Sequence, residues 1–349
     1  MLQFIETVNS AVNNFIWGVP AMVCIFGVGL YLSLRTHFLQ IRKFPYAIKT
    51  TIGRMFRKKN ASDGALTPFQ AVCTALAATV GTGNIAGVAG AIAIGGSGAI
   101  FWMWISAILG MCTKFAEVTL AVHFREKNAD GDLVGGPMYY ITHGFSGKWQ
   151  TIAKPLAYFF AFAGVLVAWL GIGTFSQVNS ITASLQNSFD WSPKIVSVIL
   201  ALITAAIIFG GIQSISKVSE KVVPFMAGLY ILAALVVIFT NFNQLLPVLG
   251  MVFQSAFTGK AAVGGFAGAT VMVAMRLGIA RGVFSNESGL GSAPIAAAAA
   301  KTEEPVEQGL ISMTGTFIDT IIICTLTGLA ILVTGQWSGS LEGAPMTQA

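Results

Sequence analysis

Long apolar runs with few charges dominate this 349-residue sequence, and they constrain its fold more than any other feature. A helix needs roughly 20 apolar residues to cross the hydrocarbon core of a bilayer, which is about 30 Å thick. Only 10% of the residues are charged, against about 25% in soluble domains, and 55% are hydrophobic. Eight segments are candidate spans: residues 14–34, 67–95, 98–122, 154–185, 195–211, 222–240, 263–300 and 309–335. The sequence therefore predicts an all-α polytopic membrane protein, and it argues against a soluble enzyme or a disordered chain.

The lengths of several segments predict irregular helices. Segments 154–185 and 263–300 are too long for one straight span, so each must tilt, break or continue into water. Segment 195–211 is short for a span. The apolar stretch 245–260 is shorter still, and we expect an interfacial or re-entrant helix there.

The basic residues predict the orientation of the chain. Residues 35–59 contain eight Lys or Arg and no acid, which places this stretch in the cytoplasm. When the eight spans are threaded alternately from there, fifteen basic residues fall inside, two outside and three within spans. We therefore expect the N-terminus outside. Because the membrane topology accounts for the basic excess, a nucleic-acid partner has no support.

Segment 67–95 contains polar residues and glycines near its middle. Residues 79–84 read TVGTGN, which is a poor sequence for a lipid-facing helix. An unwound turn there would free backbone amides that suit a carboxylate, and carbonyls that suit Na⁺ or an ammonium group. The alternative is tight helix packing through Gly83, Gly87 and Gly90. The added threonines and Asn84 favour a binding site.

Segment 263–300 contains a second irregularity, with Arg276, Arg281 and Glu287 at membrane depth. Charges at this depth need partners or water. The helix could be discontinuous, with its break facing the first one. Alternatively, the span could end near Gly282 and be followed by a cytoplasmic loop and an Ala-rich surface helix. The two interpretations do not exclude each other.

Other polar side chains within the spans also require an explanation. Gln177 could contact a substrate or bind a neighbouring helix. Lys114 and Glu117 are three residues apart, which predicts an intrahelical ion pair. Asp319 could couple an ion, or it could pair with one of the two arginines of segment 263–300. The four Cys and three His form no metal-binding pattern, and no His accompanies the Ser and Glu residues of 285–288. A membrane-embedded hydrolase is therefore disfavoured.

Three separated motifs resemble one transporter family. The strings GTGNIAGVAGAIAIGG (81–96), GGPMYYI (135–141) and RGVFSNESGLGSAPIAAAAAKT (281–302) are similar to those of the alanine or glycine:cation symporters. This resemblance implies a leucine-transporter-like fold of two inverted five-helix repeats with an extra N-terminal helix. On that template, 14–34 is the extra helix, 67–240 is the first repeat, and 263–335 begins an incomplete second repeat. About eight of the expected eleven helices would be present, so the chain resembles a truncated member.

The resemblance also implies roles for individual residues. The substrate would contact the backbone of Thr79, Thr82 and Gly83, the side chain of Gln177, and a second break that includes Gly278 and Gly282, while Asn84 would brace the first break. The backbone carbonyls of Ala77 and Val80 would bind Na⁺.

The function implied is sodium-coupled import of a small neutral amino acid, alanine or glycine, by alternating access across a prokaryotic plasma membrane. The partners would be the amino acid, Na⁺ as the coupling ion and the lipid bilayer, with no further cofactor and no covalent chemistry. Because helices of the family fold are missing, the alternative is a non-transporting fragment or an amino-acid-binding remnant.

Overall fold

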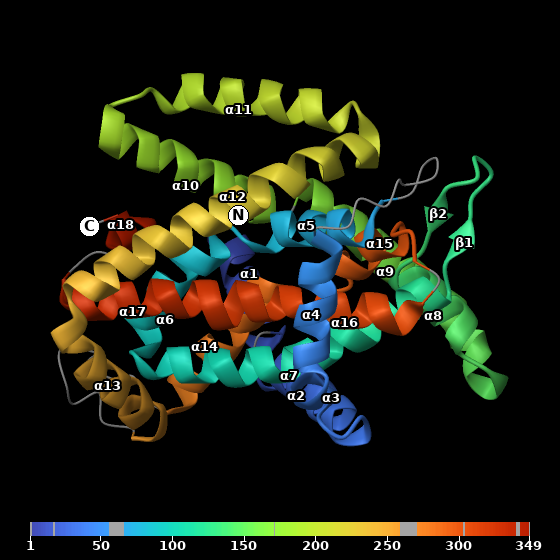
Figure 1. Ribbon diagram of the computed structural model, residues 1–349, viewed down its shortest axis with the longest axis horizontal. Coiled ribbons are helices and arrows are strands. Elements are labelled where there is room, and N and C mark those ends of the chain that lie inside the picture. Colours follow the sequence, from blue (N-terminus) through green and yellow to red (C-terminus); the bar gives the residue numbers. More distant parts are fainter. Residues whose placement is uncertain are drawn as a thin grey trace.

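The computed structural model describes residues 2–16, 18–55, 66–170, 172–258, 271–302, 304–339 and 343–348, and these residues are almost entirely helical (Figure 1). The two-stranded hairpin β1 (Glu126–Lys127) and β2 (Leu133–Val134) is the sheet within these ranges. The helices before the hairpin are α1 (Leu2–Ile16), α2 (Val19–Arg35), α3 (Leu39–Arg42), α4 (Phe44–Met55), α5 (Pro68–Thr79), α6 (Val88–Gly95) and α7 (Gly98–His123).

The chain after the hairpin is also helical. Its helices are α8 (Pro137–Gly144), α9 (Gln150–Leu170), α10 (Ile172–Phe189), α11 (Pro193–Ile208), α12 (Gly211–Thr240), α13 (Leu245–Phe257), α14 (Val271–Asn286), α15 (Ser292–Ala298), α16 (Pro305–Thr316), α17 (Thr325–Thr334) and α18 (Ala344–Gln348). Two π-helical segments, Gly83–Gly87 and Phe317–Cys324, join α5 to α6 and α16 to α17.

The described helices confirm a membrane protein with several apolar spans. Four helical stretches are long and apolar enough to cross a bilayer: Gly98–His123, Gly147–Trp169, Gly211–Thr240 and Pro305–Thr334. The pair Phe69–Thr79 and Gly83–Gly95, bent by 52°, passes the same test together and is either a broken span or a re-entrant loop. Shorter apolar helices, Met22–Arg35 and Pro193–Ile208, lie where two further spans were expected.

One predicted boundary was wrong, that between the spans 195–211 and 222–240. The stretch 212–221, expected to be a loop, belongs to α12, which begins at Gly211 with a positive φ of 66°. Helices α9 and α10 cover segment 154–185 apart from Gly171, which lies outside the described residues. The apolar stretch 245–260 contains α13, whose Val248 and Val252 belong to the main hydrophobic core.

Helix α7 lies at the centre of the packing. It runs for 26 residues, and α2, α6, α13, α14, α15 and α16 all pack against it. In contrast, α11 lies at the edge of the molecule, where it packs against α10 and α12 (Figure 1). Most of its exposed side chains are apolar, Ile203 and Ile208 among them, as lipid contact requires.

Two glycines let α14 approach α7 closely. A Cβ at Gly278 would collide with the carbonyl oxygen of Ala99 and lie 2.7 Å from the Cβ of Trp102. One at Gly282 would lie 3.0 Å from the Cβ of Ser106. The prediction that Gly278 and Gly282 belong to a break was wrong, because α14 continues through both to Asn286. These glycines permit tight helix packing instead.

We expect Gly278→Ala to destabilise the protein. An added methyl group at this crossing should cost about 1–3 kcal/mol through overpacking. Gly90→Ala is the matched control, because no atom lies within 4 Å of a Cβ there and alanine favours the helix by roughly 0.5–1 kcal/mol. Thermal unfolding of the purified variants in detergent measures both changes. If both variants unfold at the same temperature, the close approach of α7 and α14 is not what Gly278 provides.

Candidate functional site

The first break, residues 80–82, separates α5 from the π-helical turn that leads into α6, and it lies inside the predicted range. Helix α5 begins with a capping box in which Thr67 and Gln70 bond each other's backbone amides, and it ends at Thr79. Val80 then adopts an extended conformation, with φ of −77° and ψ of 102°. The chain resumes through a π-helical turn, where the amide of Gly87 donates to the carbonyl of Thr82 at 2.9 Å. Such π turns are frequent at functional sites.

Asn84 braces this break. Its Oδ1 accepts a hydrogen bond from the amide of Gly81 at 2.8 Å, so that amide no longer bonds the carbonyl of Ala77. The carbonyls of Ala77 and Val80 accept no hydrogen bond from any residue that the structure describes. The amide of Thr82 likewise donates none to a described residue. The break thus presents two backbone acceptors and one backbone donor. Because lipid offers no hydrogen bonds, a ligand or water must satisfy these groups.

The second break lies later in the chain than the sequence suggested. It comprises residues 287–291 between α14 and α15, where Glu287, Gly289 and Gly291 have φ values of 53°, 87° and 83°. The Ala-rich helix that follows is not a surface helix, because Ala297 and Ala298 are buried. Helix α14 thus runs past Gly282 to Asn286, and the turn that follows it lies towards the C-terminus of the expected break.

A buried polar cluster joins the two broken helices. The Nδ2 of Asn84 donates to the Oγ of Ser285 at 2.8 Å and to the Oδ1 of Asp319 at 2.7 Å. Ser285 and Thr320 each donate to the Oδ2 of Asp319, at 2.7 and 2.8 Å. Both Asn84 and Asp319 are 0% exposed. The cluster thus connects the first π-helical segment, the end of α14 and the second π-helical segment.

Asp319 does not pair with either arginine of the α14 segment. Arg276 donates to the Oδ1 of Asn14 at 2.9 Å, and the guanidinium of Arg281 lies 5.7 Å from the ring centroid of Phe284. The structural alternative considered for Asp319 was therefore wrong. Its described partners are the hydrogen-bond donors of the cluster.

Side chains from other helices lie against the first break. A Cβ at Gly81 would lie 3.4 Å from the Nε2 of Gln177, so the half-buried amide of α10 faces this turn. A Cβ at Gly83 would lie 3.3 Å from the ring of Phe284. The glycines thus leave room for an amide on one side and an aromatic ring on the other.

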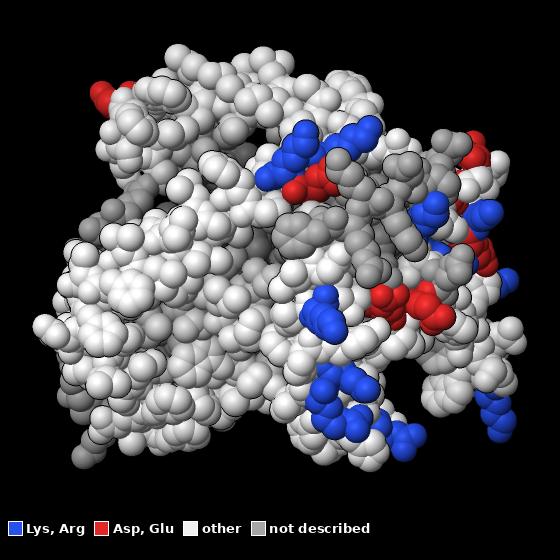
Figure 2. Space-filling model, in the orientation of Figure 1, with Lys and Arg blue, Asp and Glu red and all other residues white. Residues whose placement is uncertain are grey.

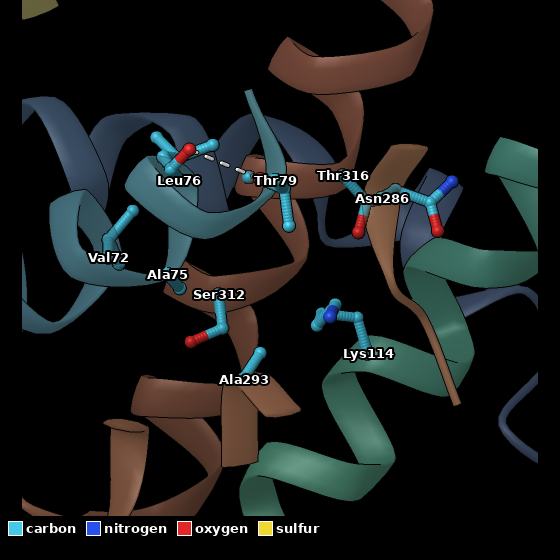
Figure 3. Close-up of a pocket in the computed structure, with 10 residues that line it drawn as sticks. Val72, Ala75, Leu76, Thr79, Lys114, Asn286, Ala293, Ser312 and Thr316 are labelled. Atoms are coloured by element: carbon cyan, nitrogen blue, oxygen red, sulfur yellow. Dashed lines mark hydrogen bonds between the residues drawn. The ribbon is translucent and has the colours of Figure 1, made fainter. Parts of the chain in front are cut away.

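A small cavity lies beside both breaks. Its volume is about 20 Å³, enough for roughly one water molecule. Figure 3 shows Lys114 reaching into it from α7, with Thr79 at the end of α5 and Asn286 at the end of α14 on neighbouring walls. Ser312 and Thr316 of α16 complete its polar lining.

The structure brings together most of the predicted site. Ala77, Thr79, Val80, Thr82, Gly83 and Asn84 all lie at the first break, and Gln177 faces it. Gly278 and Gly282 lie inside α14. Sequence reasoning missed Ser285 and Thr320 as partners of Asp319, and Phe284 as the neighbour of Gly83. The SN pair after Phe284 was visible as polar residues at membrane depth, but nothing in the sequence indicated what they contact.

Comparison with known proteins identifies the family of this chain. A sequence model described as the sodium:alanine symporter family matches residues 2–349. The chain belongs to this family. Because the match runs through residues 2–349, it does not support the expectation of a truncated member.

Several curated relatives share 40–51% identity with this family member. An uncharacterized transporter of Haemophilus influenzae is 51% identical over 98% of this chain and 73% of its own length. The sodium/alanine symporter AgcS of Methanococcus maripaludis is 47% identical over the whole chain and 76% of its own length. The probable sodium/glutamine symporter GlnT of Bacillus subtilis is 40% identical over the whole chain and 70% of its own length. The relatives' names thus include two different amino acids.

We expect Asn84→Ala to destabilise the junction of the two broken helices. It removes a hydrogen bond to a buried carboxylate, worth about 1.5–3 kcal/mol, and leaves the amide of Gly81 unbonded. Asn179→Ala on the exposed side of α10 is the matched control. Thermal unfolding in detergent should show a lower midpoint for Asn84→Ala alone. Equal midpoints would mean that the cluster contributes little to the fold.

Proposed function

We propose that this protein is a sodium-coupled symporter that imports a small neutral amino acid by alternating access. The observation that carries the proposal is the first break, where free carbonyls and a free amide lie within a few residues of one another. Membership in a family of sodium symporters supports the same conclusion. The site performs binding and release only, with no covalent step.

Na⁺ binds to the carbonyls of Ala77 and Val80 in this proposal. Carbonyl oxygens at the end of a half-helix carry partial negative charge, and they replace the water of a bound cation. Support comes from the lack of any described hydrogen-bond donor to either carbonyl. Because the helix bends by 52° between its two halves, these carbonyls lie outside the regular hydrogen-bonding pattern of an α-helix.

The substrate lies against the same break. Its carboxylate accepts from the amides of Thr82 and Gly83, its ammonium group approaches the carbonyl of Thr79, and Gln177 contacts it from α10. A small amino acid suits a turn whose Gly81 and Gly83 are already covered by Gln177 and Phe284. We propose alanine or glycine, and the relative named for glutamine makes the choice of substrate a question for experiment.

The fold proposed for this function consists of inverted repeats. The broken pairs α5–α6 and α14–α15 would be the first helices of two repeats, spanning 67–240 and 263–335, with 14–34 as an extra helix. The orientation places the N-terminus outside. Figure 2 supports it, because Lys and Arg gather towards the end of the molecule that carries α4 and the hairpin. The positive-inside rule assigns that end to the cytoplasm of a prokaryotic cell.

The alternative is a non-transporting fragment or an amino-acid-binding remnant. Uptake of radiolabelled alanine into proteoliposomes tests the transporter directly. We expect accumulation only with an inward Na⁺ gradient, and faster uptake when the interior is negative, since each net charge gains about 2.3 kcal/mol per 100 mV. Binding of alanine without any uptake would instead identify a binding remnant.

We expect Gln177→Ala to weaken alanine binding at saturating Na⁺. The loss of a hydrogen bond to a charged group costs about 1.5–3 kcal/mol, which raises Kd by roughly 10- to 150-fold. Calorimetric titration of the purified protein measures this change. Gln186→Ala on the same helix serves as the control. An unchanged Kd in a folded Gln177→Ala variant would assign Gln177 to helix packing.

A further inference from the structure

A buried ion pair lies opposite the second break and is not used by the function proposed above. Lys114 and Glu117 of α7 are only 4% and 7% exposed, and the Nζ of Lys114 lies 3.2 Å from the Oε1 of Glu117. The intrahelical pair predicted from their spacing is thus confirmed. Burying two charges costs more than such a pair usually returns, and apolar replacements of buried pairs are often neutral or stabilising. Stability alone is therefore a weak reason for its presence.

Both members of the pair also bond the backbone of the second break. The Nζ of Lys114 donates to the carbonyl of Glu287 at 3.1 Å, and the Oε2 of Glu117 accepts from the amide of Gly289 at 3.1 Å. These two bonds hold the loop at its first and third residues. Glu287 has a φ of 53°, a conformation that residues other than glycine adopt only when the surroundings impose it.

The held loop is directly connected to the candidate site. Ser285 and Asn286 immediately precede Glu287, and Ser285 contacts both Asn84 and Asp319. Asn286 donates to Thr320 at 3.1 Å. A shift of the loop would therefore move the side chains that join the second broken helix to the brace of the first. Lys114 also lines the cavity beside Thr79 (Figure 3).

We propose that Lys114 and Glu117 are positioning residues for the second break, and that they set the affinity for substrate and Na⁺ without touching either ligand. The inference rests on the proposed function. The pair fixes the loop 287–291, the loop fixes Ser285 and Asn286, and these residues hold the polar cluster against the first break. Because the pair is neutral overall, its contribution is geometric.

The double variant Lys114→Met/Glu117→Gln tests the positioning role without leaving an unpaired charge inside the protein. It removes both buried charges, so no unpaired charge remains to unfold the protein. The amide that replaces the carboxylate of Glu117 can still accept from the backbone of Gly289, whereas the thioether that replaces the ammonium group of Lys114 cannot donate to the carbonyl of Glu287. We expect the single variant Lys114→Met to lose both thermal stability and alanine binding. The double variant should regain the wild-type melting temperature, while its alanine Kd at saturating Na⁺ stays at least about tenfold above wild type.

Thr119→Ala is the control on the same helix, because its hydroxyl bonds the carbonyl of Phe115 and does not contact the loop. It should leave the alanine Kd unchanged. A double variant that binds alanine like wild type would overturn the proposal, and so would one whose stability is not restored, since the pair would then serve folding alone. If wild type itself binds no alanine with Na⁺, the proposed function fails instead.

Discussion

A broken helix inside a bilayer must find partners for every backbone group that it frees, because lipid supplies none. The rest of this structure depends on how that requirement is met at two places. At the first break, Asn84 bonds the amide of Gly81 but leaves the carbonyls of Ala77 and Val80 without a donor among the described residues. At the second, Lys114 and Glu117 bond the backbone of Glu287 and Gly289. The first break thus keeps backbone groups without described partners, whereas two side chains of α7 hydrogen-bond the backbone of the second.

The buried charges follow the same logic. Asp319 lies within a cage of three hydrogen-bond donors at a point where the two broken helices and the second π-helical segment meet. Lys114 and Glu117 neutralise each other and bond the neighbouring loop. Each charge therefore has a local partner and also joins segments far apart in the chain. This arrangement connects the two breaks through hydrogen bonds, a connection that the proposed coupling of ion and substrate binding would use.

Much of the site could be predicted from the sequence, and the limits have physical causes. The first break was predictable because TVGTGN combines glycine, which permits irregular backbone, with polar side chains that lipid would not solvate. The second was misplaced because Gly278 and Gly282 give the same compositional signal. Their role is to admit α7, and the neighbouring helix that explains them lies far away in the sequence. The partners of Asp319 were missed for the same reason.

The sequence by itself determined the membrane environment, the approximate positions of the spans, the first break and the Lys114–Glu117 pair. Each of these follows from the hydrophobicity of the local segment or from spacing along one helix, which are properties of neighbouring residues. Only the tertiary structure decided which glycines open the backbone and which close a helix crossing. It also decided that Asn84 meets Ser285 and Asp319, because contacts with residues 201 and 235 positions away depend on how the helices pack together.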